Sequence, residues 1–201
     1  QGSSMRRWLV SLCRAPVTGV ILILCTLIFG ASLVGLFQPI AAALMIMPLG
    51  NLLQNHEWWR LLGPAFIHFS VLHFIFNLLW WSMLGSQVER QFGSSFIIIL
   101  FVVTALVSNL AQLIVSGPNF GGLSGVVYGL VGFVWITGWL RPQWGLYLPK
   151  AIVGFMLVWL LLGFADVLWV NMANAAHTAG LISGCVMAWL LTLGSGKPTA
   201  R

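Results

Sequence analysis

Charged residues are scarce in this 201-residue chain. Only 6% of the residues are charged, whereas 60% are hydrophobic. Water-soluble domains carry about 25% charged residues, so the composition excludes a soluble globular fold. The net charge is +6, but the nine lysines and arginines are spread thinly and form no basic face of the kind that nucleic-acid binding requires. The composition therefore predicts a polytopic membrane protein and excludes nucleic acid as a partner.

Cysteine pairs and internal repeats are also missing. Cys13, Cys25 and Cys185 lie far apart and form no Cys-x-x-Cys motif, which excludes a disulfide framework and a cysteine-based metal site. We interpret them as small apolar residues. No repeat with a period of 20 to 50 residues is visible, and no linker divides the chain. The sequence therefore predicts one domain.

Long apolar segments make up most of the chain. About 20 apolar residues are needed to cross a bilayer as a helix. Six segments approach this length: 16–37, 68–85, 94–115, 124–140, 150–164 and 174–193. The connection 38–67 is long, and its apolar part 40–47 is too short to cross, so we expect that part in the membrane interface. We predict an all-α bundle of six transmembrane helices with a long, partly interfacial first loop.

The two ends of the chain lie outside this predicted domain, which covers residues 16–193. Residues 1–15 comprise Gln1-Gly2-Ser3-Ser4, which resembles the remnant of an expression tag, and a basic N-terminal segment. Residues 194–201 form a short polar tail, which we expect to be disordered.

The basic residues predict an orientation for the six helices. Arg60 is the only lysine or arginine that falls outside if the N-terminus is cytoplasmic. Cytoplasmic loops carry an excess of basic residues, so both termini are expected on that side. The eight basic residues then placed inside are Arg6, Arg7, Arg14, Arg90, Arg141, Lys150, Lys197 and Arg201.

A glycine-rich turn with a serine, Gly121-Gly122-Leu123-Ser124-Gly125, opens the fourth segment. Alone, such a string is also typical of close packing between membrane helices. Its position adds meaning, because the second, fourth and sixth helices would all run from outside to inside. At 1.5 Å per residue, His73, Asn77, Ser124 and His177 would each lie within roughly 10 Å of the outer end of their helix. Three segments therefore place polar residues in one shallow layer.

The residue types in that layer are those of nucleophilic catalysis. Serine attacks poorly unless a base such as a neutral imidazole removes its proton, as His177 could do for Ser124. The oxyanion that forms needs hydrogen-bond donors, and the available ones are His73, Asn77 and the Ser124 backbone N–H. Glycines at helical spacing on both helices would allow the close approach that this pair requires. On the sixth helix these are Gly180 and Gly184, and on the fourth Gly125, Gly129 and Gly132.

Structural interpretations of these polar residues remain open. His177 could make an ordinary interhelical hydrogen bond, and His73 could simply bond to Asn77 one turn later. We interpret His68 as structural and His56 as solvated. Two residues could orient His177. Asp166 could act as the third member of a triad, but a loop carboxylate is more often solvated. Tyr128 could instead stack on the imidazole, so a Ser–His dyad is the better interpretation.

Three motifs on three helices resemble the rhomboid intramembrane serine proteases, in particular the bacterial GlpG type. They are His73-x-x-x-Asn77, Gly122-Leu123-Ser124-Gly125 and His177-Thr178-Ala179-Gly180. The similarity extends to Trp59-Arg60, His68-Phe69-Ser70 and the stretch from Glu89 to Ser94, and covers roughly residues 58–188. Three motifs in this order are specific, although each alone is weak.

The resemblance implies a function and residue roles. Ser124 would be the nucleophile, His177 the general base and then acid, and Tyr128 would pack on His177. His73, Asn77 and the Ser124 N–H would form the oxyanion hole, with Gly122 supporting it. The partners implied are single-span membrane proteins cut near the outer end of their helix, in the lipid bilayer of a bacterial inner membrane. No metal or cofactor is implied. GlpG-type proteins often carry a soluble domain ahead of the first helix, and the chain as given lacks one.

Two other classes of function are less consistent with the residues. A rhomboid-like pseudoprotease that binds membrane clients would share the six helices but would normally lack Ser124 or His177. A channel or transporter would ordinarily show inverted repeats or ionisable residues along a path, whereas here these residues gather in one layer.

Overall fold

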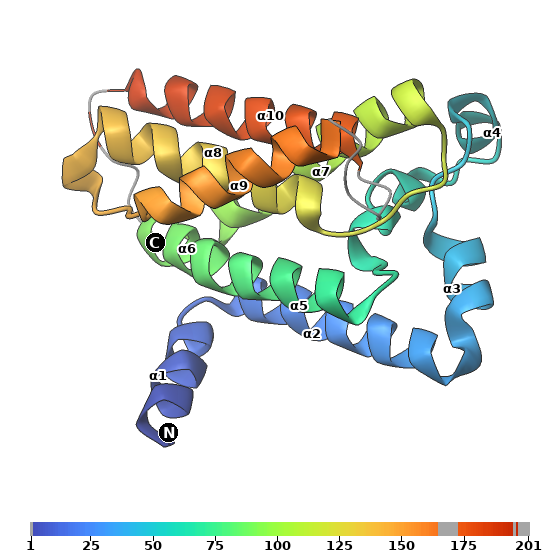
Figure 1. Ribbon diagram of the computed structural model, residues 1–201, viewed down its shortest axis with the longest axis horizontal. Helices are drawn as coiled ribbons and strands as arrows, with labels where there is room; N and C mark the ends of the chain where they lie inside the picture. Colours follow the sequence, from blue (N-terminus) through green and yellow to red (C-terminus); the bar gives the residue numbers. More distant parts are fainter. Residues whose placement is uncertain (1, 165–172, 195, 197–201) are drawn as a thin grey trace.

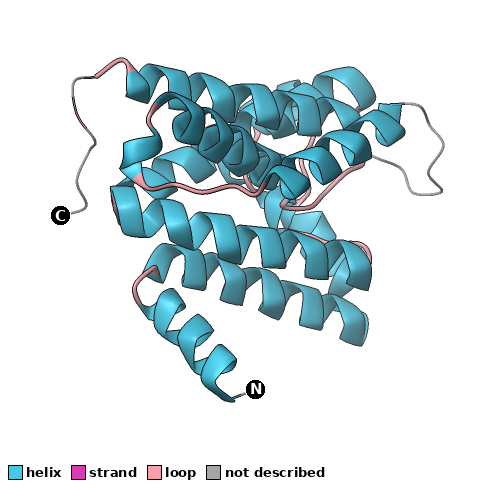
Figure 2. Ribbon diagram, turned by 60° about the vertical axis from the view of Figure 1, so that its left-hand side comes forward, coloured by secondary structure: helices cyan, strands magenta, loops and turns pink. Residues whose placement is uncertain are grey.

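The chain folds into a bundle of helices. The computed structural model describes residues 2–164, 173–194 and 196, and these ranges contain helices and loops but no β-strand (Figure 2). Two apolar helices, α8 (Ser124–Leu140) and α9 (Lys150–Phe164), are short. Four described helical stretches are long and apolar enough to cross a membrane: Pro16–Leu44, Val71–Phe92, Ser94–Ser116 and Asn174–Thr192. The chain is therefore an all-α polytopic membrane protein, as its sequence predicts.

The first long stretch is bent. After α1 (Gly2–Cys13), helix α2 (Pro16–Ala31) passes through the π-helical turn η1 (Ser32–Leu36) into α3 (Phe37–Leu44). Gly35 in this turn has φ +93°, a conformation that favours glycine. Figure 1 shows the result, because α3 runs across the end of the bundle instead of continuing along α2. The predicted interfacial stretch 40–47 thus lies mostly in α3, and its depth in the bilayer stays a prediction.

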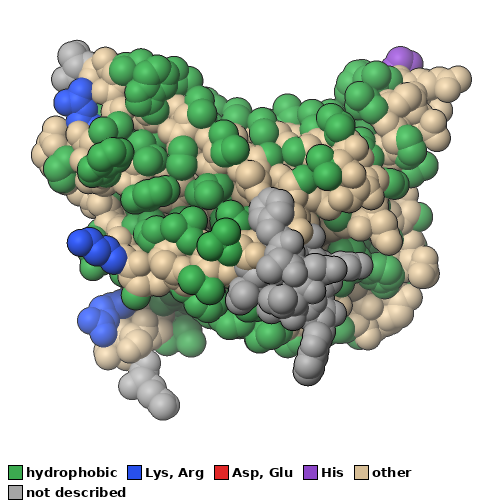
Figure 3. All heavy atoms as spheres, turned by 45° about the horizontal axis from the view of Figure 1, so that its top comes forward, with side chains coloured by type: hydrophobic (Ala, Val, Ile, Leu, Met, Phe, Trp, Pro, Cys, Tyr) green, Lys and Arg blue, Asp and Glu red, His purple; other side chains and the backbone are tan. Residues whose placement is uncertain are grey.

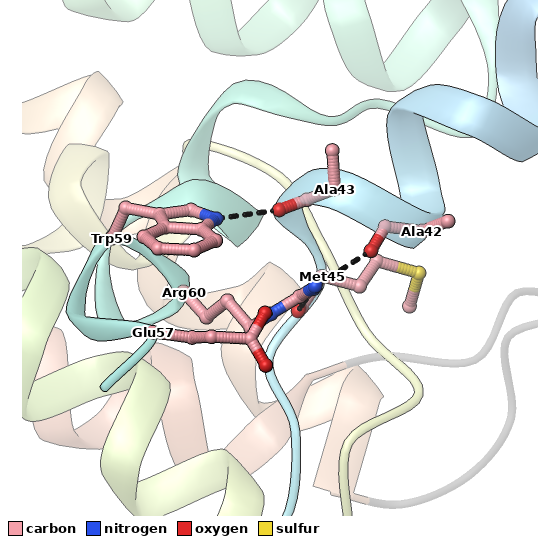
Figure 4. A network of polar contacts seen from close by, with 6 residues as sticks. All are labelled: Ala42, Ala43, Met45, Glu57, Trp59 and Arg60. Carbon is pink, nitrogen blue, oxygen red and sulfur yellow. Dashed lines mark hydrogen bonds and ion pairs between the residues drawn. The ribbon is translucent and has the colours of Figure 1, made fainter. Parts of the chain in front are cut away.

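The first loop continues through three short helices and is tied back to α3. They are α4 (Leu49–Gln54), η2 (Trp58–Leu61) and η3 (Gly63–Phe66). Arg60 donates to the Met45 carbonyl at 2.9 Å and to the Ala42 carbonyl at 2.8 Å, and the Trp59 indole donates to Ala43 at 2.6 Å (Figure 4). The carbonyls at a helix C-terminus have no partner within the helix. The Trp-Arg pair supplies donors there and so anchors the loop on the end of α3.

The second span differs from its predicted bounds of 68–85. The helix begins at Val71, where the Ser70 hydroxyl accepts from the His73 N–H at 3.2 Å, and continues through α5 (Val71–Trp80), η4 (Trp81–Gly85) and α6 (Ser86–Phe92). It ends only at Gly93, which has φ +97°. The polar stretch after Gly85 lies beyond the predicted end of this segment. It stays helical because its carboxylate has a partner inside the bundle.

That carboxylate belongs to Glu89, which caps the N-terminus of α2. It accepts from the backbone N–H groups of Val17 and Thr18 at 3.0 and 2.8 Å, and from the hydroxyls of Thr18 and Ser94. Glu89 is only 2% exposed. A negative group at a helix N-terminus is favourable because the unpaired N–H groups point at it. Glu89 thus joins α2, α6 and the start of α7 (Ser94–Ser116).

Helix α8 occupies the centre of the molecule. Every side chain from Ser124 to Val134 is buried, and the neighbours of α8 in the core come from α5 to α7, α9 and α10 (Asn174–Thr192). Figure 1 shows α8 running beside α10, with α9 in front of both. Beyond α8 the chain turns through η5 (Pro142–Trp144). The third to sixth spans match the predicted segments to within about one residue at each end.

Candidate active site

The loop before α8 is shaped by close contact with α5. Gly122 has φ +116°, and its N–H donates to the Pro64 carbonyl at 2.8 Å. A Cβ added to Gly122 would lie 2.6 Å from Cε1 of His73. Any other residue here would therefore be strained and would also push His73 away. Glycine lets this loop deliver Ser124 to the first position of α8, directly beside the start of α5.

Ser124 and His177 form a hydrogen-bonded pair. Ser124 Oγ lies 2.8 Å from Nε2 of His177, which is in the first turn of α10. Both side chains are buried, Ser124 to 9% and His177 to 4% exposure. The geometry suits a serine hydroxyl that donates to a neutral imidazole, and such an imidazole can take the proton as the oxygen attacks. The structure thus brings together the two residues that the sequence places on separate helices.

Glycines bring the two helices into backbone contact. A Cβ on Gly180 would lie 2.1 Å from the Gly125 carbonyl oxygen, and one on Gly184 would lie 1.9 Å from that of Gly129. No side chain fits at either place. The serine and histidine side chains reach only a short distance from their helices. Their hydrogen bond therefore requires this degree of approach between α8 and α10.

Two residues could orient His177, namely Tyr128 and Asp166. The Tyr128 ring lies 4.6 Å from the imidazole, centroid to centroid, and its hydroxyl donates to the Met156 carbonyl at 3.0 Å. Asp166 lies outside the described residues. Nδ1 of His177 has no hydrogen-bond partner in the part of the chain that the structure describes. The contact that limits the ring there is therefore packing against Tyr128.

His73 and Asn77 both belong to the first two turns of α5. His73 lies against Gly122, next to the start of α8. Asn77 is 5% exposed, and its amide nitrogen donates no hydrogen bond to any described residue. The hydrogen bond in which this amide would donate to His73 is therefore not formed. A buried amide without a partner costs about 1–3 kcal/mol, so its retention needs another reason.

His68, in the segment just before α5, supports the same loop. Its Nε2 accepts from the Leu123 N–H at 3.2 Å, and its ring lies 5.4 Å from that of His73. The side chain is 2% exposed. Burial, and to a smaller extent the neighbouring His73, lower the pKa of His68 from 6.5 to about 3. It is therefore neutral, as an acceptor at Nε2 requires, and its structural interpretation fits these contacts. His56, by contrast, is exposed.

Polar residues of α7 contact the chain next to the Ser–His pair and the first loop, and sequence reasoning missed them. Oε1 of Gln112 accepts from the Ala176 N–H at 3.1 Å, directly before His177, and Asn109 Nδ2 donates to the Leu61 carbonyl at 2.8 Å. Ser108 faces Gly125. All three are buried. The available signal was their presence inside an apolar span, where polar side chains are expensive and usually face other helices.

Fold and site together define a class: a multi-pass helical membrane protein with a Ser–His pair set at the adjoining ends of two tightly packed helices. Comparison with known families gives the particular group. The model of the rhomboid domain matches residues 55–194, and the chain belongs to the rhomboid family.

Relatives from bacteria support this assignment. The chain is 44% identical over 185 residues to the rhomboid protease GlpG of Salmonella choleraesuis, covering 92% of this chain and 66% of that protein. It is 46% identical over 147 residues to the rhomboid protease GlpG of Yersinia pseudotuberculosis, covering 73% and 53% respectively. The same name and the same values hold for the Yersinia pestis protein. The chain thus spans between about half and two thirds of the length of these curated relatives.

Proposed function

We propose that this protein is an intramembrane serine protease of the GlpG type. The observation that carries the proposal is the 2.8 Å contact between Ser124 Oγ and His177 Nε2 at the ends of two helices. Family membership supports it, because the similar proteins are named rhomboid proteases. A pseudoprotease that only binds membrane clients would have no use for a buried Ser–His pair.

The proposed reaction proceeds in two halves. Ser124 Oγ attacks the carbonyl carbon of the scissile peptide bond while its proton passes to Nε2 of His177. The tetrahedral intermediate collapses, the C–N bond breaks, and His177 returns the proton to the leaving amine. Water then attacks the acyl-enzyme with His177 again as base, which releases the carboxylate product and restores Ser124.

The negative oxygen of each intermediate needs donors already in place. The Ser124 N–H lies at the start of α8, where backbone N–H groups have no partner within the helix. The unpartnered amide of Asn77 and the imidazole of His73, held against Gly122, are the proposed side-chain donors. This role would explain why a buried amide is left without a partner. Tyr128 is proposed to hold the His177 ring in place.

We infer that the substrates are transmembrane proteins cut near the outer end of their helix. A peptide bond inside an intact helix has its carbonyl bonded and shielded, so it must unwind before Ser124 can reach it. Segments with glycine or proline near the membrane boundary unwind at lower cost and should be preferred.

The proposed orientation places both termini in the cytoplasm and the Ser–His pair toward the outer side of the inner membrane. Arg141 supports it, because its guanidinium donates to the Thr192 carbonyl at the C-terminus of α10, the end opposite His177. Figure 3 shows lysine and arginine side chains at one end of the visible face and a histidine at the other. Basic residues on the cytoplasmic side are the rule for membrane proteins.

Labelling with a fluorophosphonate probe tests the proposal. The wild type should react covalently and cleave a model single-span substrate, because Ser124 is activated by His177. Ser124→Ala and His177→Ala should each abolish both signals while circular dichroism stays unchanged. Ser183→Ala is the matched control, since its hydroxyl donates to the Gly180 carbonyl within α10, and it should retain activity. Labelling of Ser124→Ala at the wild-type level would refute the assignment.

A further inference from the structure

A groove separates α1 from the outward face of α5 and α6. It has a volume of about 600 Å³, within the range of about 300–1,000 Å³ typical of small-molecule sites. The Trp8 indole donates to the Ser82 hydroxyl at 2.9 Å, and Arg90 donates to Ser11, so polar contacts hold α1 beside this face. None of the residues that line the groove belongs to the proposed Ser–His pair or to its proposed oxyanion donors.

The walls of the groove change from apolar to cationic along its length. Phe76, Leu79 and Met83 are 43%, 58% and 41% exposed and line one part. Arg7 and Arg90 line the other. Phe76 and Leu79 lie on α5, Met83 on the π-helical turn η4 and Arg90 on α6, so these lining residues follow one another along a single continuous helical stretch. An apolar groove that leads to two guanidinium groups matches a phospholipid, because the acyl chain would contact the apolar part and the phosphate the guanidinium groups.

No described carboxylate neutralises the cationic end. Within the described ranges the acidic residues are Glu57, which pairs with Arg60 at 2.6 Å, and Glu89, which is buried on the N-terminus of α2. No acidic residue lines the groove. The counter-charge for Arg7 and Arg90 must then come from outside this part of the chain. Basic pockets at the cytoplasmic side of helix bundles attract anionic lipid headgroups.

We propose that this groove binds an anionic glycerophospholipid. Its phosphate lies between Arg7 and Arg90, and one acyl chain follows Phe76, Leu79 and Met83. A zwitterionic lipid fits less well, because its ammonium group would face the two guanidinium groups. The Trp8 indole, next to Arg7 in the chain, also lines the groove, and tryptophan is enriched at the headgroup boundary.

Native mass spectrometry of the full chain tests this site. The protein is delipidated in detergent and exposed to equal amounts of phosphatidylglycerol and phosphatidylcholine with identical acyl chains. Each basic residue near an anionic lipid contributes about 1 kcal/mol, so Arg7→Gln and Arg90→Gln should each weaken phosphatidylglycerol binding about fivefold. Arg6→Gln is the matched control, because Arg6 is exposed on the same helix but does not line the groove.

The outcomes separate the alternatives. Preferential retention of phosphatidylglycerol, lost in Arg7→Gln but kept in Arg6→Gln, supports the site. Equal losses in Arg7→Gln and Arg6→Gln overturn it, because binding would then reflect overall charge. Equal retention of the two lipids overturns it as well. Displacement by millimolar inorganic phosphate would show a simple anion site and likewise contradict the proposal. None of these readouts depends on proteolysis.

Discussion

At the residue scale, the site consists of short polar side chains buried among apolar ones. Burying a polar group costs free energy unless it is hydrogen-bonded. Ser124 and His177 satisfy each other, whereas the amide nitrogen of Asn77 and Nδ1 of His177 have no partner among the described residues. The unpartnered Asn77 amide is thus free to act as the donor that the proposed oxyanion site would need before substrate arrives.

The proposed oxyanion donors can be tested by truncation. His73→Ala and Asn77→Ala should each lower kcat by roughly ten- to a thousandfold, because a donor to the transition state is lost. KM should change little, since the ground state does not use that bond. Cleavage kinetics of a model substrate in detergent measure both constants, with exposed Asn51→Ala as the control. If kcat is unchanged in both variants, His73 and Asn77 only pack.

Acid should destabilise the protein partly through His68. Its folded pKa of about 3 lies below the ordinary value of 6.5. Below pH 6.5 the unfolded chain therefore binds a proton that the folded chain excludes, and stability falls as pH falls toward 3. At pH 5 this proton uptake by the unfolded chain lowers the free energy of unfolding by about 2 kcal/mol.

Thermal unfolding in detergent at pH 7.5 and pH 5 measures this effect. His68→Gln keeps an acceptor for the Leu123 N–H but cannot be protonated, so its midpoint should drop less than that of the wild type. His56→Asn, at an exposed position, should behave as the wild type does. Equal pH sensitivity in His68→Gln and the wild type would remove His68 from the explanation.

At the scale of elements, the contact between α8 and α10 decides whether the site exists. Helices in lipid gain little from apolar burial against each other, and close packing at small residues replaces it. The Gly180 and Gly184 positions meet the backbone of α8 directly. Glu89 and Arg60 act similarly at the ends of α2 and α3, where each supplies the partners that helix termini lack.

Gly184→Ala should therefore separate α8 from α10. Its Cβ would lie 1.9 Å from the Gly129 carbonyl oxygen, and such overpacking costs about 1–3 kcal/mol. The unfolding midpoint in detergent should fall, and activity should fall with it because the Ser–His distance grows. Gly154→Ala on α9 is the control, since among the described residues no atom beyond the backbone of its own helix lies within 4 Å of the added Cβ. A Gly184→Ala protein as stable as Gly154→Ala would contradict this account of the interface.

At the scale of the whole molecule, polar and basic residues separate along the bundle. The starts of α5, α8 and α10 gather His73, Ser124 and His177 at one end. Arg141 and the C-terminus of α10 lie at the other. This polarity is what the proposed orientation rests on, because the membrane retains basic loops on the cytoplasmic side.

Thiol labelling in spheroplasts measures that orientation. Cys13 is exposed at the C-terminal end of the basic helix α1, so a membrane-impermeant maleimide should label it only after permeabilisation. On a Cys13→Ser background, Asn55→Cys in the first loop should be labelled in intact spheroplasts. The reverse pattern would invert the topology.

The sequence alone determined the class of the molecule and supplied the candidate residues of the site. Low charge and six apolar segments predict a membrane bundle, because the length of an apolar segment is a local property that can be counted directly from the sequence. Motifs at the starts of the second, fourth and sixth segments predict that Ser124 and His177 lie at the same level, because helix direction is expected to alternate from one span to the next, and the two side chains are in contact. The third to sixth helices follow their predicted bounds closely, because the ends of an apolar segment can also be read from the sequence.

Only the tertiary structure decided which partners each polar group has. The continuation of α6 to Phe92 depends on Glu89 reaching α2, 71 or more residues away in the chain. The bond from Leu123 to His68, the contact of Gln112 with α10 and the unpartnered amide of Asn77 are equally long-range. Hydrogen bonds between helices depend on rotation and separation to within a few tenths of an ångström, and residue periodicity does not carry that information.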